Sequence, residues 1–185
     1  MAYRNGTYVA FHANGTNVPI ESDIKYYNLI KAWCGKDDDC FSIVNSHDKT
    51  AAVRDSSSKE TLRASLKVRL NNSKNMILII GDTTKDDLDW VPFEIEYAVD
   101  ICKIPIIVAY LGAEGIRNVR AMSSKWPPAL TKRIDNGTAM LIHIPFKKEP
   151  IHDAASYFTH NNPPKGGSVG IYSDEAYKRW GIAIQ

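Results

Sequence analysis

The stretch "NMILII", residues 75–80, decides the fold. After its first residue it is apolar without interruption, and the turn-forming pair "GD" follows at once. A strand that is apolar on both faces is typical of a parallel sheet covered by helices on both sides. We therefore predict that residues 75–80 form a central strand, and that "IPIIVAY", residues 104–110, forms another buried strand of the same sheet.

Strand and helix patterns alternate outward from these two runs. Further strands are expected at residues 7–11, 40–45 and 138–144, and helices at 22–33, from a capping box at Ser57 and Glu60 onward, at 92–102 and at 127–135. The first helix offers Ser22 or Asp23 as its N-cap. This alternation favours an α/β fold with a five-stranded parallel, flavodoxin-like sheet and helices on both faces.

The length of 185 residues suits one domain with a single sizeable core. We place that domain at residues 1–146. Residues 147–185 are expected to form a helix, a Pro/Gly-rich linker at 161–168 and a docked tail, with no role that the pattern assigns.

Composition excludes several function classes. The net charge of +2 comes from interspersed Lys and Arg, so no nucleic-acid groove is indicated. No charged leader precedes an apolar run, and no run approaches the roughly 18 apolar residues of a membrane span, so we expect a cytoplasmic protein. The three cysteines lack any CxxC or metal-ligand spacing, which predicts reduced thiols and no zinc site.

The expected sheet also places a binding site. In the strand order 2-1-3-4-5, the loops after the first and third strands flank the crevice where ligands bind. These loops are "HANGTNVPIES", residues 12–22, and "GDTTKDDLDWVP", residues 81–92. Because Glu94 follows the second loop directly, the fold prediction puts this carboxylate near the mouth of the crevice.

A helical wheel separates Glu94 from its neighbour Glu96. At about 100° per residue from the start of the helix, Glu94 lies about 80° from the centre of the apolar stripe and Glu96 about 120°. The stripe that faces the core consists of Val91, Ile95, Ala98, Val99 and Cys102. We predict that Glu94 is a boundary residue and that Glu96 faces solvent. The alternative for Glu94 is an ordinary first-turn charge favoured by the helix macrodipole.

Stretches spread over residues 7–145 resemble the TIR-like component of Thoeris anti-phage defence; they include "YVAFHANG", "FSIVNSHD", "NMILIIGDTTK", "WVPFEIEYAV" and "IPIIVAYLG". The resemblance implies a TIR fold that cleaves NAD⁺ between nicotinamide and ribose and makes a cyclic ADP-ribose-type signal. NAD⁺ would be the substrate, with no further cofactor and no metal. The implied partners are an effector protein activated by the product and further copies of the chain in a homo-oligomer.

The resemblance also implies which residues form the site. Trp90 and Glu94 stand at the W-x-x-x-E spacing of the family, so Glu94 would be the catalytic carboxylate that stabilises the oxocarbenium-like ribose. The implied substrate-binding residues are Phe11, His12, Asp48, Arg54, Asp55 and Trp90. Arg54 could equally pair with Asp48 or Asp55 and order its loop. His12 stands where many relatives have an acidic residue, which is a departure from the family.

Two other functions compete with this one. The same fold serves as a noncatalytic adaptor or nucleotide-sensing module, because fold does not fix function. A phosphoacceptor like that of response regulators is disfavoured, since no pair of acidic residues follows the first strand to hold Mg²⁺.

Overall fold

The structure is a computed structural model that describes residues 4–14, 22–36, 40–44 and 59–184. It shows one parallel sheet in the order β2-β1-β3-β4-β5-β6. The strands are β1 (Gly6–Ala10), β2 (Ile43–Val44), β3 (Ser73–Ile80), β4 (Ile106–Tyr110), β5 (Leu141–Pro145) and β6 (Gly170–Ile171). The predicted flavodoxin-like α/β fold is confirmed, but the sheet has six strands and not five.

The strand β3 is central, as its apolar run predicts. It pairs with β1 on one side and with β4 on the other. Residues 76–80 have no exposed surface, and successive side chains enter two different cores. Met76, Leu78 and Ile80 face one core, whereas Ile77 and Ile79 face the other. A run without alternation thus follows from burial on both faces.

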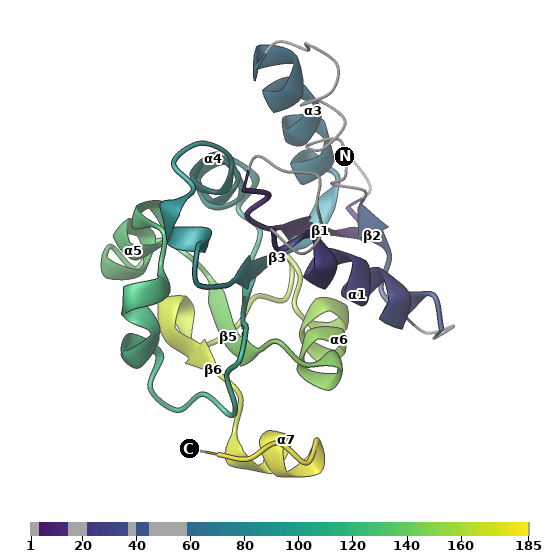
Figure 1. Ribbon diagram of the computed structural model, residues 1–185, viewed down its shortest axis with the longest axis vertical. Helices are drawn as coiled ribbons and strands as arrows, with labels where there is room; N and C mark the ends of the chain where they lie inside the picture. Colours follow the sequence, from purple (N-terminus) through teal and green to yellow (C-terminus); the bar gives the residue numbers. More distant parts are fainter. Residues whose placement is uncertain (1–3, 15–21, 37–39, 45–58, 185) are drawn as a thin grey trace.

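Helices cover both faces of the sheet. They are α1 (Ile24–Cys34), α3 (Lys59–Asn71), α4 (Trp90–Glu96), α5 (Pro128–Asp135), α6 (Lys148–Tyr157) and α7 (Asp174–Arg179). The helices α1 and α6 pack on one face, while α3, α4 and α5 share the core of the other face (Figure 1). Short 3-10 segments are η2 (Thr84–Asp86), η4 (Val119–Lys125) and η5 (Gly167–Val169).

The helix predicted at 92–102 begins at Trp90, and its second half widens into a π-helical segment, η3 (Tyr97–Cys102). It ends at Cys102, and the C-cap residue Lys103 has a left-handed φ of 55°. The predicted apolar stripe is nevertheless buried in full, with every member at most 5% exposed. Such π segments are rare and are found frequently beside functional sites.

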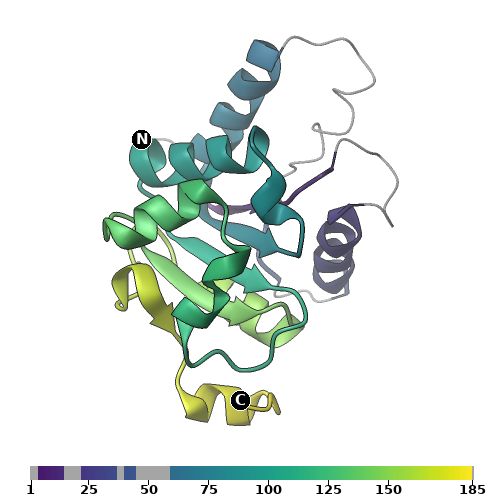
Figure 2. The same cartoon turned by 60° about the vertical axis from the view of Figure 1, so that its left-hand side comes forward.

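The C-terminal residues complete the same sheet and core. Ile151, Ala154 and Ala155 of α6 pack in the core beside β3, β4 and β5. β6 extends the sheet by pairing in parallel with β5, and a side chain at Gly170 would collide with the carbonyl oxygen of Leu141. The following α7 lies beyond the sheet, at the end opposite α3 (Figure 2). The proposed division at residue 146 stays a prediction.

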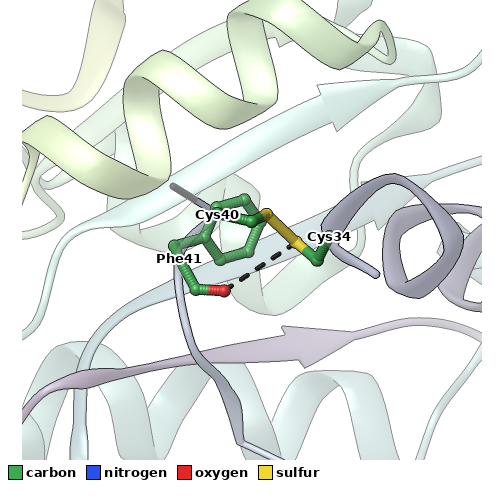
Figure 3. The surroundings of a disulfide bond; sticks show 3 residues. All are labelled: Cys34, Cys40 and Phe41. Carbon is green, nitrogen blue, oxygen red and sulfur yellow. Dashed lines mark hydrogen bonds between the residues drawn. A yellow bond between two sulfur atoms is a disulfide. The ribbon is translucent and has the colours of Figure 1, made fainter. Parts of the chain in front are cut away.

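The prediction of three reduced thiols is wrong for two of the cysteines. Cys34 at the end of α1 and Cys40 before β2 form a disulfide (Figure 3). Cys102 is free and buried. The chain returns from α1 to β2 within a few residues, which brings the two Cα atoms to 5.0 Å, a distance that suits a disulfide. The spacing of six residues matches no motif, so the sequence gives no sign of the pair.

None of the helices formed by the described residues is long and apolar enough to cross a membrane.

Candidate functional site

An open crevice of about 510 Å³ lies at the carboxyl ends of β1, β3 and β4. This is the edge at which the strand order reverses between β1 and β3, so the crevice is where the sequence predicted it. Its described walls come from Ser22, Asp23 and the first turn of α1, from the loops after β3 and β4, and from η4. The lining residues are Ser22, Asp23, Lys25, Tyr26, Asp82, Thr83, Leu111, Gly112 and Lys125.

Asp23 is the buried carboxylate of this crevice. It occupies the N-cap position of α1, but its side chain makes no capping hydrogen bond. The Ser22 hydroxyl accepts from the Ile24 N–H instead, at 3.3 Å. The Asp23 carboxylate accepts a hydrogen bond from the Thr84 hydroxyl at 3.3 Å. Burial raises the pKa of Asp23, since the ionised form is poorly solvated there.

Backbone contacts hold this carboxylate against the end of β3. The Asp23 N–H donates to the His12 carbonyl at 3.1 Å, and the Gly81 N–H donates to the Thr84 hydroxyl at 2.8 Å. A Cβ at Gly81 would lie 3.0 Å from both Asp23 Oδ1 and the Leu111 side chain. The glycine that follows β3 therefore leaves the space that the carboxylate occupies.

Two lysines stand nearer the solvent. The Lys25 ammonium lies 5.0 Å from the centre of the Tyr26 ring, and Lys125 pairs with Asp82 at 3.0 Å. Asp82 is 91% exposed, so this ion pair is weak. The crevice thus combines a deep carboxylate with two cations and an aromatic ring near its mouth.

Glu94 and Glu96 differ in solvent exposure as predicted, and the difference is larger than the helical wheel indicates. Glu96 is exposed and lies 3.7 Å from Arg133. Glu94, predicted at the boundary of the core, has no exposed surface. The Tyr8 phenol of β1 donates a hydrogen bond to Glu94 Oε1. Burial, together with the negative charge of Glu94, raises the pKa of Tyr8. The boundary prediction was wrong because Tyr8 meets the helix on that flank, and Glu94 is not in the crevice wall.

The other predicted residues that are described also lie outside the crevice wall. Phe11 is buried and stacks on Tyr27, with ring centres 5.3 Å apart. His12 contacts the crevice residue Thr83 through Nδ1 at 3.2 Å. Trp90 is half-buried at the start of α4, and its backbone N–H donates to Asp87 Oδ1. Asp48, Arg54 and Asp55 lie outside the described residues.

A second group of buried polar side chains lies on the face of the sheet that carries α4 and α5. Trp126 Nε1 donates to the Tyr110 hydroxyl at 2.8 Å, which is 2.8 Å from His143 Nδ1. His143 Nε2 is 3.1 Å from the Ser168 carbonyl oxygen, which can only accept, so Nε2 carries the proton and Nδ1 accepts. Burial lowers the pKa of His143 to about 4.

Across residues 4–14, 22–36, 40–44 and 59–184, no three His, Cys, Asp or Glu side chains gather in a way that could hold a metal ion. Asp23 was not predicted as a site residue, because its position in the sequence suggested only a helix cap. The signal that could have found it is its place directly after residues 12–22, the first loop of the expected crevice.

A family model described as "Thoeris protein ThsB, TIR-like domain" matches residues 8–115, which is more than half of the chain. The matched range contains Tyr8, Asp23 and Glu94, together with the end of β3 and the loop after β4.

Proposed function

The chain belongs to the family of the Thoeris protein ThsB, TIR-like domain, and from this membership we propose that it cleaves NAD⁺ in anti-phage defence. The reaction is that of an NAD⁺ glycohydrolase or ADP-ribose cyclase, which releases nicotinamide and forms a cyclic ADP-ribose-type signal. That signal activates a partner effector protein, and the enzyme works in the cytoplasm as a homo-oligomer.

The family match carries this proposal, and Glu94 is the candidate catalytic carboxylate because it stands at the W-x-x-x-E spacing from Trp90. Glu94 has no exposed surface, and the hydrogen bond from Tyr8 is one of the contacts that offset the cost of burying a carboxylate. Carboxylates kept in such surroundings are frequent at functional sites. Nicotinamide leaves as a neutral molecule and needs no proton, so one carboxylate that stabilises the positive ribose is sufficient.

Along the chain, the segment after β3 connects the crevice residues to the helix that carries Glu94. Asp82 and Thr83 line the crevice, and Glu94 lies on the helix that follows. The start of this helix is held by Asp87, which accepts from the Trp90 N–H at 2.8 Å, and by an exposed ion pair between Lys59 and Asp89. In the proposed cycle the start of α4 moves to admit the ribose, since Glu94 is closed to solvent in this conformation.

A noncatalytic nucleotide-sensing or adaptor function is the second candidate. The full burial of Glu94 favours it, because a carboxylate that never meets the ligand would serve the fold alone. In that function the crevice binds the nucleotide, and the Tyr8–Glu94 pair joins β1 to α4.

NAD⁺ turnover tests the two functions against each other. The purified chain is incubated with NAD⁺ over a range of protein concentrations, and the products are separated by chromatography. We expect nicotinamide from the wild type and from Glu96→Gln, and a loss on the order of 100-fold or more in Glu94→Gln. Glu96→Gln is the matched control because it removes an exposed carboxylate from the same helix.

An unchanged rate in Glu94→Gln would remove this residue from the chemistry. If NAD⁺ stays intact at every protein concentration while calorimetry shows that it binds, the nucleotide-sensing function takes the place of the enzymatic one. Specific activity that rises with protein concentration would support a homo-oligomeric enzyme.

A further inference from the structure

We propose that the crevice binds the ribose-phosphate part of a nucleotide, with Asp23 accepting hydrogen bonds from the two ribose hydroxyls and with Lys25 and Lys125 holding the phosphate. This inference deepens the proposed function and rests on it for the identity of the natural ligand. It assigns a binding role to residues that neither the sequence motifs nor the family match singles out.

Asp23 is free to serve a ligand because the helix does not use it. An aspartate at an N-cap position ordinarily accepts from the first N–H groups of the helix. Here Ser22 accepts from Ile24, and the Asp23 carboxylate turns to the crevice. A carboxylate that accepts from a vicinal diol is a common means of binding ribose.

Neighbouring residues hold the Asp23 carboxylate in place. The Thr84 hydroxyl, which is itself fixed by the Gly81 N–H, donates to Asp23 Oδ2 at 3.3 Å. The absent side chain of Gly81 provides the space beside Oδ1. Burial raises the pKa of Asp23, which means that the protein solvates its charge poorly and that ligand hydroxyls would stabilise it.

Depth sets the orientation of the ligand. Asp23 is only 8% exposed, whereas Lys25 is exposed and the Lys125 side chain is 34% exposed. The hydroxyls of the ribose therefore enter first, and the phosphate stays near the mouth. Lys125 can leave the exposed Asp82 for a phosphate at little cost, since exposed ion pairs contribute little. The Tyr26 ring offers a surface against which a base or sugar can pack.

Among the described residues, two aspartates and two lysines line the crevice, and their charges cancel. Selection follows from the placement of the charges. A ligand with a diol at one end and a phosphate at the other fits, whereas inorganic pyrophosphate meets the lysines alone.

Calorimetry with ADP tests the inference without requiring turnover. We expect the wild type to bind ADP and Asp23→Asn to bind it about tenfold more weakly or worse, because a hydrogen bond to a charged group is lost. The matched control is Asp86→Asn, which neutralises an exposed aspartate of η2 outside the crevice wall and should bind as the wild type does. Circular dichroism confirms that each variant is folded.

A second ligand identifies the group that Asp23 contacts. 2′,3′-Dideoxyadenosine diphosphate lacks the diol, so the wild type should bind it about tenfold more weakly than ADP. Asp23→Asn should discriminate between the two ligands less than the wild type does, since its neutral amide replaces the charge-assisted hydrogen bonds with weaker ones. If Asp23→Asn still distinguishes the two ligands as the wild type does, or if ADP fails to bind at millimolar concentration, the inference is wrong.

The two proposals fail separately. Nicotinamide release with unchanged ADP binding in Asp23→Asn would leave the enzyme intact and overturn the role of Asp23. ADP binding that depends on Asp23, without NAD⁺ cleavage, would establish the crevice and overturn the enzymatic function.

Discussion

Polar side chains are buried in two regions of this molecule, and the two regions treat them differently. Beneath α4 and α5, the Tyr8 phenol donates to Glu94, and Trp126, Tyr110 and His143 form a chain in which each hydrogen has an acceptor. In the crevice, Asp23 is almost as deeply buried, but within the described part of the chain its carboxylate accepts from one hydroxyl, at 3.3 Å. Partners within the protein make burial stabilising, whereas burial with few partners leaves a group ready for a ligand.

The largest expected effect concerns His143, which belongs to the hydrogen-bonded polar side chains buried beneath α4 and α5. Its pKa lies at about 4 in the folded protein and near 6.5 when unfolded, so between these values the unfolded state binds the additional proton. The stability that neutral His143 contributes is present above pH 6.5 and is lost as the pH falls toward 4. We expect the free energy of unfolding to fall by about 3 kcal/mol from this group, measured by urea denaturation between pH 7 and pH 4.

The variant His143→Gln isolates this effect from other acid-sensitive groups. Glutamine does not titrate, so the stability of the variant should fall less steeply over the same interval. Equal slopes for the wild type and the variant would show that His143 is not held neutral by its surroundings, and the contrast with the crevice would weaken.

The next effect concerns the Tyr8–Glu94 pair. Tyr8→Phe removes the donor and leaves a buried carboxylate oxygen without the phenol, so we expect the free energy of unfolding to fall by about 1–3 kcal/mol. Tyr157→Phe is the matched control, because that ring is 62% exposed and its hydroxyl loss should change stability by less than about 0.5 kcal/mol. Urea denaturation at pH 7 compares the two. Equal stabilities would show that the Tyr8 hydrogen bond adds nothing to the fold.

The contrast between the regions also shows what sequence patterns can predict. The apolar run of β3 and the stripe on α4 and η3 are local patterns, and the structure has both where they were expected. β6 was missed because its sequence is Gly170 followed by one apolar residue, and the glycine is required by the nearby carbonyl of Leu141. No local pattern encodes that contact.

The candidate site likewise has features that the sequence predicts and features that it does not. The crevice could be located from the strand order alone, since the switch point follows from topology. The burial of Glu94 could not be predicted, because its partner Tyr8 lies 86 residues away in the chain. Asp23 was assigned as a cap because a capping aspartate and a ligand-binding aspartate look alike in sequence, and only the turn of its side chain toward Thr84 separates them.

The smallest effect tests the crevice itself through the stability of Asp23→Asn. Because burial raises the pKa of Asp23 in the folded protein, the folded state holds its proton to higher pH than the unfolded state does. The wild type should therefore lose stability relative to the variant as the pH rises through the acid range above 3.8, and should remain lower at neutral pH. We expect the variant to be as stable as the wild type at pH 3 and up to about 1 kcal/mol more stable at pH 7, as is common when a binding residue is replaced. Urea denaturation at both pH values measures the difference, with Asp86→Asn as the exposed control. If the wild type is instead the more stable protein at pH 7, the fold already supplies Asp23 with the partners that stabilise its charge. The crevice would then resemble the hydrogen-bonded polar side chains buried beneath α4 and α5.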